Sequence, residues 1–301
     1  MPSYVYFRQE IVPLSEAKIG VMTNSFHYGN ACFEGVRGNW NSQQGQLHLF
    51  RLKEHYERML RGCRLLKIDL PYTIDDLCRI TVEMVEKCGF QEDLYVRPVA
   101  YKSSEALGVR LHDLEDDFFV FAFPWGPYLP DKVRCCVTSW RCAREVPRAK
   151  INGLYVNNAL AKSEAIENGF DEGIMLTSDG YVAEGTGENL FLVKDGRLVT
   201  PAVYCSILLG ITRDTVMRLA KEELGIETEE RIIERSELYT ADECFLTGTA
   251  ANITPVSEID RRKTGDGEIG EVTRKLQQLY FDVIRGNDAK YIDWCMPVYK
   301  K

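Results

Sequence analysis

Apolar residues recur along the first part of the chain at spacings typical of short strands and amphipathic helices. The apolar run at 47–50 predicts a strand, and apolar positions from 51 to 66 recur every three or four residues, which predicts a helix. Thr73 and Asp76 form a capping-box pair before a second helical pattern, which runs to about Gly89. We therefore expect a strand followed by two helices in this region.

Two further strand patterns precede a break in the chain. Residues 94–101 and 118–123 are rich in aromatic and β-branched residues, which predicts strands. Three prolines and a glycine then fall within 124–130, a composition typical of a loop between domains. The sequence therefore predicts a small N-terminal domain at 1–121, an interdomain loop at 122–131 and a larger C-terminal domain at 132–301.

The second part of the chain carries two Asp-Gly pairs, which are strong hairpin signals. Asp179-Gly180 and Asp195-Gly196 each separate short apolar runs, so we expect their four flanking strands to form an antiparallel meander. Strands and helices do not alternate regularly, which favours an α+β fold over a doubly wound parallel sheet. The elements expected here are strands at 133–140, 174–176, 181–183, 190–193, 198–199 and 241–246, and helices at 155–168, 212–225 and 271–284.

The net charge of the chain disfavours two classes of binding partner. The 301 residues include 37 Lys and Arg against 45 Asp and Glu, which gives a net charge of −8. Without a basic cluster, neither a nucleic acid nor an anionic membrane is expected as the main partner. The chain begins without a signal-like segment, and its densest apolar run, at 118–124, is too short to cross a bilayer. We therefore expect a globular, cytoplasmic protein.

Ten cysteines raise the question of disulfides or bound metal. No two cysteines follow the C-x-x-C spacing, and the four histidines show no paired-ligand spacing such as H-x-x-x-H. We expect the cysteines to be reduced and mostly buried as small hydrophobic residues, and we expect no metal site. A cysteine-rich metal-binding protein is the alternative, which a metal assay on the purified protein would test.

Three segments place small, polar and charged residues where a core would need Val or Leu. They are RAKINGLYVN at 148–157, EGTGENLF at 184–191, and the pair GITR at 210–213 with TGTAA at 247–251. Together with YGNACFEGVR at 28–37, RLKEHYER at 51–58 and YVRP at 95–98, they closely resemble the motifs of class IV aminotransferases. These are fold-type IV enzymes that depend on pyridoxal phosphate (PLP).

The resemblance covers roughly residues 20 to 285 and is closest to the branched-chain amino acid aminotransferases. It implies an α+β fold with a small N-terminal α/β domain, a larger C-terminal domain with antiparallel strands, and PLP at the domain interface. It also implies a homodimer or a higher homo-oligomer. The substrates implied are small amino acids and 2-oxo acids.

The resemblance assigns the covalent chemistry to one lysine. Lys150 is implied to form the internal Schiff base with PLP and to move the proton between Cα and C4′. Lys162 is the alternative, but it lies in the middle of a predicted helix and is expected on a solvated face. Glu184, 34 residues beyond Lys150, is implied to keep the ring nitrogen protonated, with Glu188 as its rival. Tyr155 is implied to hydrogen-bond the phenolic oxygen and so to lower the pKa of the Schiff base.

Further residues are implied to hold the phosphate of PLP. Gly210-Ile211-Thr212 opens a predicted helix, whose free amides and dipole favour an anion. Arg51 resembles the family's phosphate arginine, at a helix start where a cation is otherwise slightly disfavoured. The cofactor-binding residues implied by the resemblance are Arg51, Lys150, Tyr155, Glu184, Asn189, Leu208, Ile211, Thr212 and Thr249.

A branched-chain aminotransferase must bind an apolar side chain in one half-reaction and the side-chain carboxylate of glutamate in the other. The resemblance implies that Tyr95, with the amides of Thr249 and Ala250, meets the α-carboxylate. Arg97 lies two residues from Tyr95, so both side chains point to one face of a strand, and it is implied to bind the distal carboxylate of glutamate.

Aromatic and aliphatic residues are implied to complete the substrate pocket. Two tyrosines, Tyr28 and Tyr128, are implied to flank the arginine. Phe33, Trp125, Leu107 and Val109 are implied to form an apolar wall, and the loop at 107–109 is implied to reach in from a neighbouring subunit.

The function implied is transamination between branched-chain L-amino acids and 2-oxoglutarate. Residues 101–108, with Asn30 and Cys32, depart from the commoner family patterns, which leaves open an (R)-amine or D-amino acid transaminase. Aminodeoxychorismate lyase is a further alternative within the family. A non-catalytic PLP-binding protein is the alternative from another class, and the intact Lys150, Tyr155 and Glu184 disfavour it.

Overall fold

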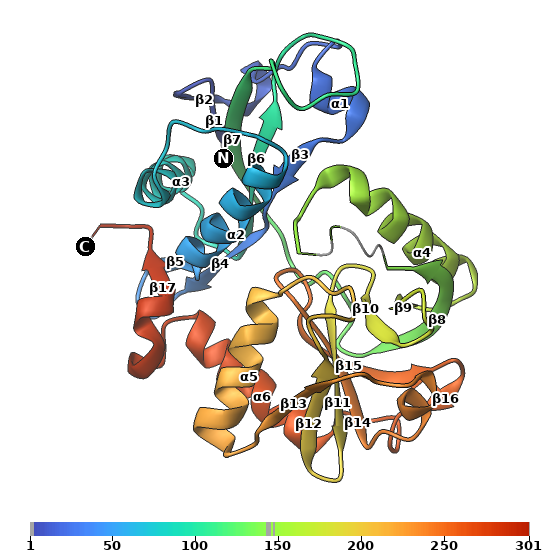
Figure 1. The fold of residues 1–301 in the computed structure, drawn as a ribbon. Helices are drawn as coiled ribbons and strands as arrows, with labels where there is room; N and C mark the ends of the chain where they lie inside the picture. Colours follow the sequence, from blue (N-terminus) through green and yellow to red (C-terminus); the bar gives the residue numbers. More distant parts are fainter. Residues whose placement is uncertain (1–2, 143–145, 147, 301) are drawn as a thin grey trace. The chain divides into compact units, whose positions relative to one another are not determined.

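The chain divides into two compact units that interleave along the sequence (Figure 1). The structure is a computed structural model that describes residues 3–142, 146 and 148–300. Unit 1 comprises Met1–Gly126, Ala149–Leu154 and Asp282–Lys301. Unit 2 comprises Pro127–Arg148 and Tyr155–Phe281.

The two units follow the expected division at one point and depart from it at two others. The first change of unit, after Gly126, lies inside the loop predicted at 122–131. Residues 149–154 and 282–301, which the sequence places in the C-terminal domain, cluster with unit 1 instead. The physical reason is strand pairing, because Ile151 bridges to Cys32, and strand β17 (Cys295–Pro297) pairs with strand β5 (Gln46–Phe50).

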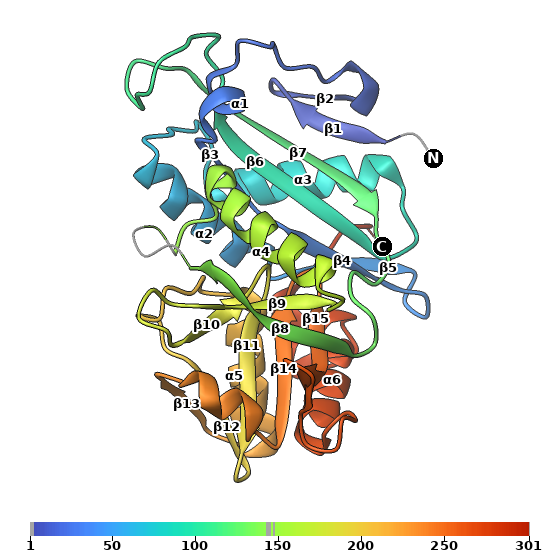
Figure 2. The ribbon, with the colours of Figure 1, turned by 90° about the vertical axis from the view of Figure 1, so that its right-hand side faces the viewer.

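Unit 1 is built on a sheet of antiparallel pairs. Among the described residues its strands run in the order β17-β5-β4-β6-β7-β1-β2, with β3 paired to β6. In Figure 2 the long strands β6 and β7 lie across helix α3. The strands are β1 (Tyr4–Phe7), β2 (Glu10–Pro13), β3 (Ala31–Phe33), β4 (Val36–Asn41), β5 (Gln46–Phe50), β6 (Leu94–Lys102), β7 (Asp116–Pro124) and β17 (Cys295–Pro297).

Two of the described helices of unit 1, α2 (Leu52–Leu65) and α3 (Ile74–Cys88), lie where the sequence predicts. The short helix α1 (Asn24–Tyr28) was not predicted. The capping box of Thr73 and Asp76 is present, and Gly89 ends α3 with a φ of +69°, a conformation that glycine adopts at little cost. The ring of Tyr56 on α2 meets that of Phe118 on β7 edge-on at 6.2 Å, and both side chains are buried in the core.

Unit 2 carries a mixed sheet. Its strands run in the order β10-β9-β8-β15-β14-β11-β12-β13, with β16 paired to β15, among the residues described. Three of the pairs, β8 with β9, β8 with β15 and β12 with β13, are parallel. The strands are β8 (Val133–Arg141), β9 (Glu172–Leu176), β10 (Val182–Gly185), β11 (Asn189–Lys194), β12 (Arg197–Pro201), β13 (Thr228–Arg231), β14 (Glu243–Gly248), β15 (Asn252–Ile259) and β16 (Arg262–Lys263).

The prediction of a continuous meander is wrong, although both predicted hairpins form. Strand β9 pairs with β10 and β11 pairs with β12, each in antiparallel register around its Asp-Gly turn. Strands β10 and β11 do not pair, because β9, β8, β15 and β14 lie between them in the sheet order. A turn sequence determines its own hairpin, but it carries no information about strands that enter the sheet from elsewhere in the chain.

Three helices accompany the sheet of unit 2. Helix α4 (Tyr155–Glu167) joins β8 to its parallel neighbour β9, and α5 (Ile211–Leu224) joins β12 to its parallel neighbour β13. Helix α6 (Glu271–Ile284) matches its predicted range. Short 3-10 helices occur at Leu14–Glu16, Asn152–Leu154, Arg235–Tyr239 and Ala289–Trp294.

The cores agree with the α+β fold expected from the sequence. Ile174, Leu190 and Leu246 lie in one buried cluster that connects the strands of unit 2. All ten cysteines are buried and free, as predicted. In the described part of the chain, every helix is too short or too polar to cross a membrane.

Candidate cofactor and substrate site

The segment that carries Lys150 runs alongside the short strand β3. The amide of Phe33 donates to the carbonyl of Lys150 at 3.0 Å, and the Lys150 ammonium lies 4.8 Å from the centre of the Phe33 ring. Two glycines permit this approach, because a Cβ on Gly153 would lie 2.7 Å from the carbonyl oxygen of Gly29. The structure therefore brings the predicted lysine against the predicted apolar wall.

Arg97 and Tyr95 share this part of unit 1, as their spacing on β6 predicts. The Arg97 guanidinium donates to the Tyr95 hydroxyl at 3.2 Å, and its Cζ lies 4.7 Å from the centre of the Phe33 ring. The buried Nε of Arg97 has no hydrogen-bond partner within the described residues. The Tyr95 ring packs edge-on against Trp125 at 4.7 Å. The site thus combines apolar rings with an arginine whose hydrogen-bonding capacity is not fully used.

Gly35 makes room for the Tyr95 hydroxyl. A Cβ at position 35 would lie 1.8 Å from that oxygen, so any larger residue would displace the tyrosine. The same glycine follows Glu34, which is wholly buried.

Tyr28 is tied to the loop that carries Leu107 and Val109. The amide of Gly108 donates to the Tyr28 hydroxyl at 2.8 Å, and Asn24 Nδ2 donates to the carbonyl of Ala106 at the same distance. The side chain of Val109 is 91% exposed and that of Leu107 is 56% exposed. In this chain, these two apolar side chains therefore face solvent.

Arg51 occupies an unusual position at the start of α2. It has a φ of +49°, in the left-handed region that costs a non-glycine residue about 1–3 kcal/mol, and its side chain is buried. Its amide donates to the carbonyl of Trp294 at 2.7 Å, and its guanidinium lies 5.1 Å from the centre of the Trp294 ring. Its Nε donates to Glu54 at 2.8 Å. The C-terminal segment of the chain thus helps to hold the predicted phosphate arginine.

A buried ionic cluster beneath β3 was not anticipated from the sequence. Glu34 accepts hydrogen bonds from His55 Nδ1 at 2.8 Å and from Arg58 Nε and Nη2 at 2.7 Å each. Burial would raise the pKa of the Glu34 carboxyl, but Arg58 and His55 hold it well below its usual range. In His55, by contrast, burial lowers the pKa of the imidazole, and nearby cations that include Lys150 lower it further. The cluster ties the segment after Phe33 to α2.

Arg37 is a second buried residue without a predicted role. It lies directly opposite Tyr95 in the register of β4 and β6, and it donates to the carbonyl of Gly126 at 3.2 Å. Its only sequence signal is its place at the end of the motif that begins at Tyr28.

Three of the residues predicted around the cofactor, Glu184, Asn189 and Leu208, meet in unit 2. Glu184 Oε2 accepts from Asn189 Nδ2 at 2.9 Å and from the amide of Leu208 at 3.0 Å. Gly210 packs directly against Asn189, because a Cβ at position 210 would lie 2.0 Å from Asn189 Oδ1. The rival, Glu188, is buried and accepts instead from the amide of Gly187 at 3.0 Å. The Glu184 carboxylate is therefore the one fixed beside the start of α5.

The N-terminus of α5 has the features expected of an anion site. Its N-cap is Gly210, which has no side chain that could accept from the amides of the first turn, and the side chains of Ile211 and Thr212 are buried. Thr249 and Ala250 lie in the turn that joins β14 to β15. Two further predicted residues belong to unit 2: Tyr155 is the first residue of α4 and is partly buried, and Tyr128 is exposed.

The expectation that Lys162 lies on a solvated face is wrong. Its side chain is only 24% exposed, and its ammonium pairs with the wholly buried carboxylate of Glu172 on β9. It also donates to the carbonyl of Asp171 at 2.7 Å. Burial alone would lower the pKa of Lys162, but the Glu172 carboxylate outweighs it and raises the pKa. The sequence did not indicate this pairing, because it depends on how α4 packs against β9.

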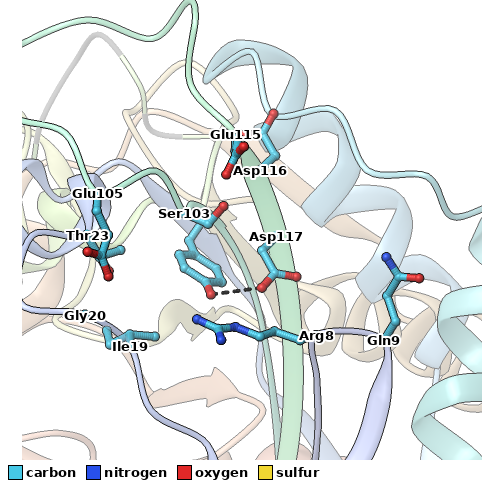
Figure 3. A pocket seen from close by; sticks show the side chains of 11 residues that line it. Arg8, Gln9, Ile19, Gly20, Thr23, Ser103, Glu105, Glu115, Asp116 and Asp117 are labelled. Carbon is cyan, nitrogen blue, oxygen red and sulfur yellow. Dashed lines mark hydrogen bonds between the residues drawn. The ribbon is translucent and has the colours of Figure 1, made fainter.

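A cavity of about 770 Å³ elsewhere in unit 1 has the wrong charge for this role (Figure 3). Four carboxylates, Glu105, Glu115, Asp116 and Asp117, line it together with one arginine, Arg8. The Tyr101 hydroxyl donates to Asp117 at 3.1 Å, and burial together with that carboxylate raises the pKa of the tyrosine. A phosphate or a carboxylate substrate would be repelled here.

The chain is similar to known proteins of one family. The family model described as amino-transferase class IV matches residues 31–259. The chain is 50% identical to a probable branched-chain-amino-acid aminotransferase of Aquifex aeolicus (strain VF5), over 99% of this chain and 97% of the relative.

Solved structures give the same result. The branched-chain aminotransferase of Thermoproteus uzoniensis with norvaline is 42% identical, with a TM-score of 0.95 over 99% of this chain and 100% of that one. The branched-chain amino acid aminotransferase of Thermobaculum terrenum in its PLP form is 38% identical, with a TM-score of 0.95 over 99% of each chain. A further branched-chain amino acid aminotransferase, complexed with N-(5'-phosphopyridoxyl)-L-glutamate, is also 38% identical, with a TM-score of 0.93 over 99% of each chain. Both the family match and the extent of these identities show that the chain belongs to the class IV aminotransferases.

Proposed function

We propose that the protein catalyses PLP-dependent transamination between branched-chain L-amino acids (leucine, isoleucine and valine) and 2-oxoglutarate. The products are branched-chain 2-oxo acids and glutamate. The observation that carries the proposal is Arg97, which lies against the ring of Phe33 with a buried Nε that has no partner in the described part of the chain. This arrangement offers an apolar surface and a cation at one place, as the two half-reactions require.

The names of the relatives support the same substrates. The Thermoproteus uzoniensis structure contains norvaline, an apolar amino acid, and the phosphopyridoxyl complex contains an adduct of glutamate. We extend both substrate classes and the cofactor to this chain.

The residues present fit PLP. When bound, PLP supplies an aldehyde that accepts the amino group and a ring that stabilises negative charge at Cα. The amides of the first turn after Gly210 suit a phosphate, and Arg51 supplies a cation at a strained backbone position. The Glu184 carboxylate, held by Asn189 and the Leu208 amide, suits a protonated ring nitrogen. We propose that Ile211, Thr212 and Thr249 complete the phosphate contacts.

Lys150 would carry the acid–base work, and Tyr155 would support it through the cofactor. The Lys150 amine would hold the aldehyde covalently and, once the substrate amine replaces it, take the proton from Cα and return it at C4′. Tyr155 would hydrogen-bond the phenolic oxygen of the cofactor. Glu184 would stay ionised throughout, since its charge is what keeps the ring nitrogen protonated.

Substrate selection follows from the cost of desolvating a carboxylate. Tyr95 and the amides of Thr249 and Ala250 would take the α-carboxylate. The distal carboxylate of glutamate needs a charged partner once it leaves water, and Arg97 would supply it, flanked by Tyr28 and Tyr128. Leucine makes no such demand and would need only the apolar surfaces of Phe33, Trp125, Leu107 and Val109.

The proposed quaternary state and location follow the family resemblance. We propose a homodimer or higher homo-oligomer that acts in the cytoplasm. The exposed side chains of Leu107 and Val109 support a second copy at this loop, because apolar groups of this size gain stability when covered. Light scattering on the purified protein would test the oligomer, and a monomer at micromolar concentration would contradict it.

A donor panel tests the proposed activity. The purified enzyme, loaded with PLP, would be assayed with 2-oxoglutarate and each of leucine, isoleucine, valine, a D-amino acid and an (R)-amine, and separately with aminodeoxychorismate. We expect the three branched-chain donors to exceed the D-amino acid and the (R)-amine in kcat/KM. A preference for either of those donors, or cleavage of aminodeoxychorismate, would contradict the proposal.

A further inference from the structure

The segment between Glu184 and Glu188 is joined to helix α4 through one threonine. Thr186 is buried, and its carbonyl accepts from Asn158 Nδ2 at 2.7 Å. Asn158 lies three residues beyond Tyr155 on α4, which is about one helical turn. This bond ties the segment that follows Glu184 to the first turns of the helix that begins at Tyr155.

A second connection runs through the buried carboxylate of Glu172. The Thr186 hydroxyl donates to Glu172 Oε1, and the Thr186 amide approaches the same oxygen at 3.4 Å. The other oxygen, Oε2, accepts from the Lys162 ammonium, which lies one to two turns further along α4. Glu172 is wholly buried, so each of these donors offsets part of the cost of removing its charge from water. The carboxylate thus bridges α4 and the 184–188 segment.

The methyl group of Thr186 is closely packed where α4 and the 184–188 segment meet. A Cβ on Gly173 would lie 2.6 Å from Thr138 Cγ2 and 3.2 Å from Thr186 Cγ2. Thr186 is therefore held on its methyl side by packing and on its hydroxyl side by hydrogen bonds, which fixes its position.

We propose that Thr186 is a positioning residue that, with Glu172 and Lys162, holds Tyr155 and Glu184 in one arrangement around the cofactor. The inference rests on the proposed function, because the roles of Tyr155 and Glu184 do. Thr186 acts through these two residues and not through a contact of its own with the cofactor. Its hydroxyl matters because valine, which has nearly the same shape, would leave Glu172 one donor short and loosen α4 from the segment.

Loosening α4 from the 184–188 segment should change the pH at which the bound cofactor titrates. In Thr186→Val, we expect the pH midpoint of the visible absorbance of the bound cofactor to rise by about half a unit or more, since the Tyr155 hydrogen bond lowers that midpoint. We expect kcat with leucine to fall by about ten- to a hundredfold, the usual result of a small misplacement, with KM little changed. Thr186→Ser keeps the hydroxyl and should restore both values toward wild type.

Thr273 provides a matched control. It is buried, its hydroxyl donates to Glu243 at 2.6 Å and its amide donates to the same oxygen at 2.8 Å. Thr273→Val therefore removes the same kind of bond from unit 2, at the start of α6. We expect it to lower stability about as much as Thr186→Val without moving the absorbance midpoint or kcat.

The experiment compares pH titrations of absorbance, PLP retention on dialysis, kcat and KM, and urea unfolding for wild type, the two Thr186 variants and Thr273→Val. A Thr186→Val midpoint and kcat equal to those of Thr273→Val would reduce Thr186 to a structural residue and overturn the proposal. If Thr186→Val does not fold, Lys162→Met replaces it, and an unshifted midpoint there overturns the proposal equally. A wild-type protein that retains no PLP would overturn the proposed function instead.

Discussion

The two units hold the residues proposed for cofactor and substrate by different means. In unit 1 the proposed charges are on long side chains, Lys150, Arg97 and Arg51, and each lies over a neighbouring aromatic ring. In unit 2 the groups proposed to bind the phosphate are backbone amides, beside a carboxylate that accepts from Asn189 and the Leu208 amide. We therefore expect the loss of a side chain to reduce activity most in unit 1. In unit 2, the addition of a single methyl group should already weaken cofactor binding.

Lys150→Ala should give the largest loss. We expect the visible absorbance of the bound cofactor to disappear and kcat to fall by at least about 10²–10⁴-fold, because the covalent attachment and the proton transfer are both removed. Absorbance spectra and steady-state rates measure the change. Lys275→Ala, on the exposed face of α6, is the control and should match wild type. A Lys150→Ala enzyme that kept its absorbance would show that another lysine holds the cofactor.

Arg58→Met tests the buried cluster of unit 1. Removing one partner of a buried ion pair typically costs about 3–5 kcal/mol, so we expect the free energy of unfolding to fall by this amount at pH 7. Urea unfolding measures it. The control is Arg79→Met on α3, whose ion pairs are exposed and should contribute little to stability.

The pH dependence of that loss follows from the lowered pKa of Glu34. Its ion pair stabilises the fold fully above the unfolded-state pKa, about 4.3, and this contribution is lost as the pH falls toward the folded-state pKa. The difference between wild type and Arg58→Met should therefore shrink below about pH 4.3. A difference that stayed constant with pH would mean that Arg58 contributes packing and not charge.

Glu184→Gln tests the carboxylate of unit 2. The amide keeps the shape but not the charge, so we expect PLP to remain bound and kcat to fall by about 10²–10³-fold, the usual range for lost electrostatic stabilisation. Single-turnover rates locate the loss in the chemical step. Glu188→Gln is the comparison. A small effect in Glu184→Gln with a large one in Glu188→Gln would exchange their roles.

Gly210→Ala should give the smallest of these losses. The added Cβ would meet Asn189 Oδ1, and overpacking of this kind costs about 1–3 kcal/mol. We therefore expect the dissociation constant of PLP to rise by about five- to a hundredfold in equilibrium dialysis. Gly126→Ala, where a Cβ meets nothing within 4 Å, is the control. Equal affinities in the two variants would remove Gly210 from the phosphate site.

Local patterns in the sequence were enough to predict most elements. The capping box at Thr73, the hairpin turns at Asp179 and Asp195, and the helical spacing of apolar residues act over a few residues, so they could be recognised without the fold. The sheet order could not, because the pairing of β8 with β15 joins segments more than a hundred residues apart.

The contacts of the candidate site could likewise be predicted only where they depend on neighbouring residues in the sequence. The closeness of Tyr95 and Arg97 follows from their spacing on one strand. The pairing of Glu34 with Arg58 and that of Lys162 with Glu172 depend on how helices pack against strands, and no local pattern records it. The roles of Lys150, Glu184 and Tyr155 toward a cofactor came from the family resemblance and remain proposals.

Arg97→Leu in single-turnover experiments tests the central claim, that one site recognises both an apolar side chain and glutamate. Loss of the partner of a buried charge costs about 2–5 kcal/mol, so we expect the rate with glutamate to fall roughly thirtyfold to several-thousandfold. The rate with leucine should fall less than about tenfold, because leucine places no charge there. Matched losses with the two substrates would contradict dual recognition and make Arg97 a structural residue of β6.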